Sequence, residues 1–291
     1  MSQRNVSRRR FLGGMAVGAA GAWGLSAGLA RLGDDPARPP ELYEYFLDNF
    51  WFKAADLEHH AINPPLKGAH KADIVIIGGG FTGLSSAHHL TRMLPNKKIV
   101  LLEGACCGYG ASGRNGGFCD AGFSGLLPWV HESGPELGRK AFDASLFGID
   151  QIKRWATEHS VQCDFEENGM LETAFTEEQA TQLEAHQATY KSMGLDATLV
   201  QGRALEAEIR SSRYLAALKF PYGGIVNPAK LARGMKVAVE RAGVEICERT
   251  RVVRVRPGRV HRIETEMGEI SAALLVLGLN GYAPVLGFFR D

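Results

Sequence analysis

The sequence lacks the residue patterns that mark metal centres and disulfide frameworks. Its five cysteines contain no CxxC pair, and its nine histidines contain no HxxxH or HExxH spacing. Structural zinc sites and zinc hydrolases use such spacings, so we expect neither a metal site nor a disulfide framework. The adjacent Cys106 and Cys107 are interpreted as packing residues of a loop and not as a redox pair.

The sequence also lacks a large net charge. Its 33 lysines and arginines nearly balance its 32 aspartates and glutamates, which leaves a formal charge of +1. A chain this close to neutral gives no basis for a nucleic-acid partner. With 291 residues, of which 45% are apolar, it has enough material for one large domain or two smaller ones with a buried core.

The first thirty residues lack acidic side chains. They carry four arginines and then an apolar run diluted by glycine, so this run is not predicted to be a stable membrane span. A basic region before an apolar stretch is typical of a targeting segment, and Arg8 and Arg9 before Phe11 resemble the twin-arginine export signal. We therefore expect a periplasmic or otherwise exported protein, with cleavage or membrane anchoring through this segment left open. The alternative is a cytoplasmic protein with a basic tail.

Residues 71–118 contain the strongest pattern in the chain. Residues 73–77 are a β-branched run followed by glycines, which is typical of a buried parallel strand. Residues 81–94 show helical spacing of apolar side chains, and residues 98–102 form a second apolar run. Strand, glycine turn, helix and strand in this order predict the start of a dinucleotide-binding βαβ unit.

The glycine turn of this unit has the spacing G-x-G-x-x-G. Gly78 permits the tight turn, Gly80 lets a pyrophosphate approach the backbone, and Gly83 lets the helix pack close to the strand. Glu103 ends the second strand, where its carboxylate can accept hydrogen bonds from a ribose 2′-hydroxyl and would repel a 2′-phosphate. A purely structural glycine turn is the alternative. The cofactor-binding residues predicted here are Gly78, Gly79, Gly80, Phe81, Thr82, Gly83, Glu103 and Gly104.

A second glycine-rich loop, residues 108–117, favours FAD over NAD. Such a loop lets the chain follow an extended FAD, whereas the second strand of a nicotinamide enzyme usually runs into another helix. Ser112 can bond a phosphate or ribityl oxygen, and Arg114 and Asn115 can approach the flavin ring. A mobile surface loop in an NAD-dependent dehydrogenase is the alternative. The residues predicted to bind FAD here are Gly110, Ala111, Ser112, Arg114, Asn115, Gly116 and Gly117.

The remainder of the chain alternates helical and strand-like patterns. Residues 41–70 are interpreted as a lead-in segment that lies across the domain surface. Helices are predicted over residues 135–160, 177–193 and 228–242, the last with Pro228 in its first turn and Gly243 as its cap. Strands are predicted within residues 165–175, 218–226, 244–255, 259–265 and 272–279.

Three stretches in the first half carry a family resemblance. IIGGGFTGLSSA, LLEG and GASGRNGG, in this order, resemble the D-amino-acid oxidase (DAO) superfamily of FAD-dependent oxidoreductases, and are most similar to its glycine, sarcosine and γ-glutamylputrescine oxidase-like branch. The resemblance covers about residues 51–291. It implies an α/β fold, in which an FAD-binding Rossmann-like domain of the glutathione-reductase type is interleaved with an α+β substrate domain. It also implies that the backbone of Val252 lies at the adenine edge and Asn280 near the cofactor.

The resemblance also divides the chain. The expected parts are a targeting segment (1–30), a linker and lead-in segment (31–70), an FAD-binding unit (71–130), a partial substrate domain (131–222) and a return to the FAD-binding domain (223–291). Relatives carry a further glycine-containing segment near the C-terminus that completes the flavin site. The chain stops before it, so we expect the fold to be incomplete at that end.

The activity that the resemblance implies is oxidation of the C–N bond of an amine or amino acid. Hydride passes to flavin N5, the imine is hydrolysed, and oxygen or a quinone or other carrier accepts the electrons. No catalytic residue is assigned. A non-catalytic nucleotide-binding fragment is the alternative from another functional class.

Overall fold

The computed structural model describes residues 49–55 and 61–289. The predicted targeting segment and most of the linker therefore lie outside the described residues. No helix within the described ranges is long and apolar enough to cross a membrane.

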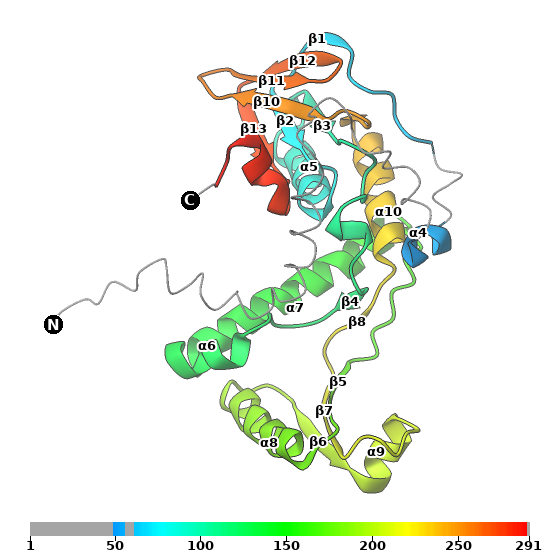
Figure 1. Ribbon diagram of the computed structural model, residues 1–291, viewed down its shortest axis with the longest axis vertical. Coiled ribbons are helices and arrows are strands. Elements are labelled where there is room, and N and C mark those ends of the chain that lie inside the picture. The colour runs from blue at the N-terminus through cyan, green and yellow to red at the C-terminus, as the bar shows by residue number, and fades with distance from the viewer. Residues whose placement is uncertain (1–48, 56–60, 290–291) are drawn as a thin grey trace, which may run out of the picture.

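A four-stranded parallel sheet lies at the centre of the upper part of the molecule in Figure 1. Its order is β13-β2-β3-β9, and every neighbouring pair is parallel. All residues of β2 and β3 are buried, as their uninterrupted β-branched and leucine side chains predict. The bounds are β2 Ile74–Ile77, β3 Ile99–Leu102, β9 Glu245–Cys247 and β13 Leu274–Leu277.

Each face of this sheet is covered by a different layer. Alternate side chains of β2 point to opposite faces, so Ile74 and Ile76 pack beneath two helices while Val75 and Ile77 pack beneath a second sheet. The helices are α5 (Phe81–Met93) and α10 (Pro228–Arg241). The second sheet has the order β1-β12-β11-β10, with β1 Gly68–Lys71, β12 Gly268–Ala272, β11 His261–Thr265 and β10 Val252–Arg256. This layered arrangement confirms the predicted α/β class.

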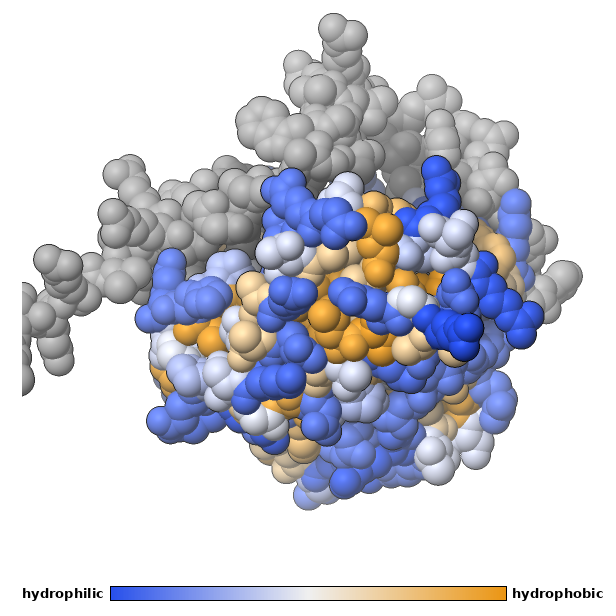
Figure 2. All heavy atoms as spheres, turned by 90° about the horizontal axis from the view of Figure 1, so that it is seen from below, coloured by the Kyte–Doolittle hydropathy of each residue, from blue (hydrophilic) through white to orange (hydrophobic). Residues whose placement is uncertain are grey.

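The lower part of the molecule in Figure 1 holds a smaller antiparallel sheet. Its order is β5-β7-β6, and α8 packs against it through Ala180 and Leu183. A capping box of Thr176 and Gln179 begins α8. The bounds are β5 Met170–Ala174, α8 Glu177–Ser192, β6 Thr198–Gln201, α9 Gly202–Glu208 and β7 Ala216–Phe220. Viewed from this end, the surface is mainly hydrophilic around an apolar patch (Figure 2).

Two features join the lower part to the upper part. The short strand β4 (Phe118–Cys119) pairs with β8 (Gly224–Ile225) in an antiparallel ribbon. The long helix α7 (Pro135–Glu158), which follows α6 (Leu126–Ser133), packs against α10 through a shared cluster that contains Ile149, Trp155 and Leu231.

The described end of the lead-in segment runs along the surface and is anchored there. Within residues 61–71 only Leu66 is buried, at 2% exposed, and the others are partly or fully exposed. Residues 68–71 form β1, which pairs with β12, and this pairing with residues far along the chain has no signal in the local sequence. Further elements absent from the prediction include α4 (Phe50–Ala54), β4, α6, β6, α9 and β12.

Candidate functional site

The glycine turn lies where β2 ends and α5 begins. Gly78 has a φ of +105°, in the left-handed region that favours glycine. A Cβ atom on Gly83 would lie 1.9 Å from the carbonyl oxygen of Gly78, so only glycine allows the first turn of α5 to pack this close to the turn. The predicted roles of these two residues in the backbone geometry are therefore supported by contacts.

Glu103 lies directly beside this turn. Its Oε2 accepts a hydrogen bond from Gly79 N at 2.7 Å, and its Oε1 accepts one from Ala105 N at 2.9 Å. Burial raises the pKa of the Glu103 carboxyl, backbone hydrogen bonds oppose that change, and the nearby charge of Glu248 adds to it. Each carboxylate oxygen keeps a lone pair that can accept a hydrogen bond from a hydroxyl group.

The N-terminus of α5 faces the same region. Ser112 Oγ accepts a hydrogen bond from Phe81 N at 2.9 Å, which leaves the hydroxyl hydrogen free to donate to a ligand. Among the residues that the structure describes, no acceptor is found for the N–H groups of Thr82 and Gly83. Free N–H groups at a helix N-terminus are an anion-binding arrangement. Together with the Glu103 carboxylate, they fit a diphosphate that is joined to a ribose.

Gly278 is a member of this site that the sequence prediction missed. It directly follows β13, and a Cβ atom on Gly78 would lie 2.4 Å from its carbonyl oxygen. The end of β13 therefore contacts the glycine turn across about 200 residues of chain. The available signal in the sequence was a glycine directly after an apolar run.

Arg114 and Asn115 are turned toward their own loop. The Arg114 guanidinium lies 4.9 Å from the ring centroid of Phe52 and 4.5 Å from that of Tyr109, and its Nε donates to Tyr109 O at 2.7 Å. Its buried Nη2 has no hydrogen-bond partner within the described residues. Asn115 Oδ1 accepts from Gly117 N at 2.9 Å, so the amide stabilises the loop. Their predicted approach to a flavin ring stays a prediction.

The other predicted residues lie on separate stretches of the chain. Gly104 lies against the backbone of Arg251, which brings Val252 to the Glu103 side of the sheet, although the Val252 side chain is buried in the core. Asn280 has a φ of +47° and begins the 3₁₀ helix η5 (Asn280–Leu286). Gly110, Ala111 and Gly116 are partly or fully exposed on the loop, whereas Gly117 is buried.

The two adjacent cysteines are packing residues, as expected. Both Cys106 and Cys107 are buried free thiols, and burial raises the pKa of each well above its ordinary value. Burial and a raised pKa both disfavour the thiolate form, as for a packing residue. Across residues 49–55 and 61–289, no three His, Cys, Asp or Glu side chains gather into a metal-binding group.

Comparison with known proteins finds similarity along most of the chain, well beyond the glycine turn. The DAO family, described as FAD dependent oxidoreductase, matches residues 73–289. Gamma-glutamylputrescine oxidoreductase of Escherichia coli is 28% identical over 233 residues, which cover 79% of this chain and 54% of that protein. The probable oxidoreductase OrdL of Haemophilus influenzae is 29% identical over 248 residues, 84% of this chain and 56% of that protein. The chain thus spans about half the length of these curated relatives.

A solved structure shares the fold. The crystal structure of glycine oxidase from Geobacillus kaustophilus matches 75% of this chain and 58% of that one, with a TM-score of 0.64 and 23% sequence identity. The matching family covers more than half of the chain and includes every residue of the glycine turn and Glu103. The chain therefore belongs to the DAO family of FAD-dependent oxidoreductases.

Proposed function

We propose that the protein binds FAD at the glycine turn and oxidises the C–N bond of an amine or amino acid. The observation that carries the cofactor assignment is the meeting of three groups at one point: the N-terminus of α5, the Glu103 carboxylate and the Gly78–Gly83 turn. The names of relatives support the substrate class, since one relative is an oxidoreductase of an amine and another a glycine oxidase.

The residues of this chain would hold the cofactor as follows. The N–H groups of Thr82 and Gly83 would donate to the diphosphate, with the Ser112 hydroxyl as a further donor. Glu103 would accept from a ribose hydroxyl, and this contact favours its ionised form. Arg114 Nη2, a buried donor on the second glycine loop with no acceptor among the described residues, would be available to an acceptor on the cofactor.

The proposed reaction needs little acid–base chemistry from the protein. When bound, the flavin supplies an acceptor for the hydride that leaves the carbon next to nitrogen. Water then hydrolyses the resulting imine to a carbonyl compound and a free amine. The electron pair passes on to oxygen or to a quinone or other carrier. We assign no catalytic residue among the described side chains.

Anaerobic spectroscopy of the whole protein loaded with FAD tests this proposal. Flavin absorbance should bleach when the matching amine or amino acid is added from a panel, with one carbonyl product per flavin reduced. A protein that binds FAD but is bleached by no member of the panel would contradict amine oxidation, and would favour a non-catalytic nucleotide-binding role. A protein that binds NAD in place of FAD would favour the dehydrogenase alternative.

We also propose that residues 1–30 direct export through the twin-arginine route, and that the segments 31–70, 71–130, 131–222 and 223–291 are the structural parts of the protein. The paired arginines before Phe11 support the export proposal. Replacing both Arg8 and Arg9 with lysine should keep the protein in the cytoplasm, whereas Arg4→Lys should not. Equal export of both variants would contradict a twin-arginine signal.

A further inference from the structure

A buried ion pair lies behind the candidate site. Lys236 Nζ contacts Glu248 Oε2 at 2.6 Å, with side chains only 11% and 2% exposed. Taking two such charges out of water costs about as much free energy as their attraction returns, so an apolar pair would stabilise the fold at least as well. The attraction between the two charges therefore does not account for the pair, and the groups that its polar atoms bind indicate its role.

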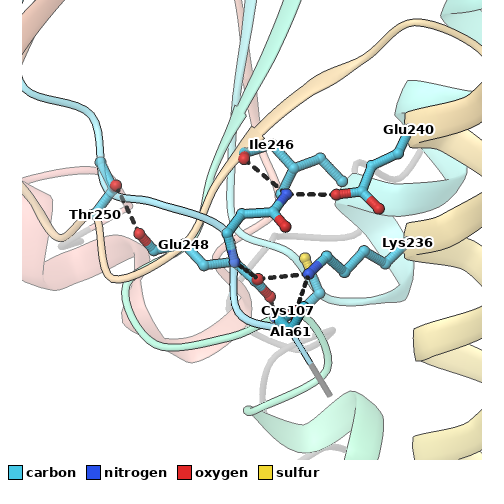
Figure 3. Close-up of polar contacts among 8 residues, drawn as sticks. Ala61, Cys107, Lys236, Glu240, Ile246, Glu248 and Thr250 are labelled. Carbon is cyan, nitrogen blue, oxygen red and sulfur yellow. Dashed lines mark hydrogen bonds and ion pairs between the residues drawn. The ribbon is translucent and has the colours of Figure 1, made fainter.

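The Glu248 carboxylate joins three separate parts of the chain (Figure 3). Its Oε1 accepts a hydrogen bond from Cys107 N at 2.7 Å, on the loop that follows Glu103. Its Oε2 accepts one from Asn63 N at 2.7 Å, in the lead-in segment, as well as the contact from Lys236 on α10. Lys236 Nζ also donates to Ala61 O at 3.0 Å.

The loop bound by Glu248 is the one that holds the glycine turn. Gly108 N donates to Gly79 O at 2.9 Å, and Gly79 N donates to Glu103 at 2.7 Å. A Cβ atom on Gly79 would lie 2.8 Å from Cys107 Sγ. Residues 103–108 thus bind both the N–H and the C=O group of Gly79, and Glu248 binds the same loop at Cys107.

The two residues after Glu248 also bind the loop, through backbone hydrogen bonds. Arg249 N donates to Ala105 O at 2.9 Å, and Thr250 N donates to Glu103 O at 2.8 Å. Thr250 Oγ1 in turn accepts from Leu66 N at 3.0 Å, so the lead-in segment follows the other side of the same stretch. The Cys107 amide is buried and would lose its acceptor if the Glu248 carboxylate were removed.

We propose that Glu248, oriented by Lys236, is a positioning residue for the FAD site and couples the lead-in segment to that site. It acts through the Cys107 amide, which sets the position of residues 103–108 and so of Glu103 and Gly79. The cofactor part of this inference rests on the proposed function, whereas the loop-holding part does not. Because coupling between two sites is reciprocal, bound FAD should also stabilise the contacts of residues 61–66.

Hydrogen exchange of the full chain, measured with and without FAD, tests the inference. In Glu248→Gln, exchange of residues 103–109 and 61–66 should be about tenfold faster without FAD, because a charge-assisted hydrogen bond to each segment is weakened. FAD should bind about tenfold more weakly for the same reason. In the unsubstituted chain FAD should slow exchange in residues 61–66, and in Glu248→Gln this protection should be lost. In Lys236→Met, hydrogen exchange in the same two segments should also become faster.

A matched control lies on the same strand segment. Glu245, in β9, pairs with Lys98 at 3.0 Å, both side chains are about half exposed, and no hydrogen bond from its side chain to the loop or the lead-in segment is found among the described residues. Glu245→Gln should leave exchange in residues 61–66 and 103–109, and FAD affinity, unchanged. Helix α8 (residues 177–192) reports whether Glu248→Gln still folds.

Three outcomes would overturn the inference. The first is Glu248→Gln exchange that matches the unsubstituted chain in residues 103–109. The second is faster exchange spread evenly over the whole chain, α8 included, because Glu248 would then support only general stability. The third is saturating FAD that leaves residues 61–66 unprotected. If FAD does not bind the unsubstituted chain at all, the proposed function fails, while exchange in residues 103–109 still decides the role of Glu248.

Discussion

At the residue scale, Gly83 has the tightest contact of the candidate site. Its missing side chain lets the backbone of α5 reach the Gly78 carbonyl, and a methyl group there would meet a backbone atom that cannot rotate away. We expect Gly83→Ala to lower the free energy of unfolding by about 1–3 kcal/mol, the range for overpacked sites, and to weaken FAD binding. Urea unfolding measures the first effect and a fluorescence titration with FAD the second.

A helical glycine without neighbours serves as the control. Gly148 lies in α7, and a Cβ atom there would have nothing within 4 Å. Gly148→Ala should raise the free energy of unfolding by up to about 1 kcal/mol, since alanine is the better helix former. If both glycine variants destabilise the chain equally, crowding at Gly83 is not the cause.

Glu103 should make both stability and FAD binding depend on pH, in opposite directions. Because its pKa is raised in the folded chain, its contribution to stability is complete below the ordinary glutamate pKa and is lost as the pH rises through the raised value. FAD affinity should instead increase over that interval, since a ribose hydroxyl donates to the ionised form. Titrations and urea unfolding at a series of pH values should show both trends, and Glu103→Gln should show neither. A pH-independent FAD affinity in the unsubstituted chain would contradict this role.

At the element scale, the contact between α5 and α7 depends on a buried histidine. His88 is 7% exposed, and Trp155 Nε1 donates to its Nδ1 at 3.4 Å. Burial lowers the pKa of His88, the nearby positive charge of Arg92 acts in the same direction, and Glu158 opposes the change. His88 therefore packs between α5 and α7.

This histidine predicts weakening of the fold in mild acid. A group with a lowered folded pKa contributes stability above its unfolded pKa, here about 6.5, and that contribution is lost as the pH falls. The free energy of unfolding should therefore decrease below about pH 6.5 in the unsubstituted chain, and less steeply in His88→Gln. His89→Gln, on the exposed side of the same helix, should keep the unsubstituted slope. Identical slopes in all three proteins would rule His88 out as the cause.

The elements that sequence analysis found are those whose signal is local. The runs that became β2 and β3 are apolar throughout. Helix α10 begins at Pro228, and Gly243, with a positive φ, lies two residues after its last residue, Arg241. Strand β12 was missed because its sequence GEISA alternates weakly, and it exists through pairing with β1 and β11 on its two sides. Pairing between distant segments leaves little signal in the sequence of either segment.

The residues of the candidate site also differ in whether a local sequence signal reveals them. Gly78, Gly83 and Glu103 could be found because one motif with fixed spacing contains all three. Glu248 and Lys236 could not be assigned a role, since their importance arises from the loop and lead-in segment that they join. A lysine on the apolar face of α10 and a glutamate directly after β9 were the available signals for a buried pair.

At the scale of the whole molecule, the cofactor region is built from two distant stretches. Residues 71–118 supply the glycine turn and Glu103, while residues 244–280 supply β9, Glu248, β13 and Gly278. The helical and antiparallel unit between them is joined to this region through the α7–α10 cluster and the β4–β8 ribbon. The site therefore depends on long-range contacts, and neither stretch can form it alone.

The most direct test of the account is a parallel titration of the purified chain with FAD and with NAD. We expect one FAD to bind per chain, with a flavin absorbance spectrum shifted from that of free FAD, and binding of NAD at least about a hundredfold weaker, a difference of roughly 2.7 kcal/mol. Gly83→Ala should weaken FAD binding, because a Cβ atom there displaces the turn that holds the cofactor. A folded chain that binds NAD as tightly as FAD, or Gly83→Ala that binds FAD as the unsubstituted chain does, would contradict the assignment of the glycine turn as an FAD site.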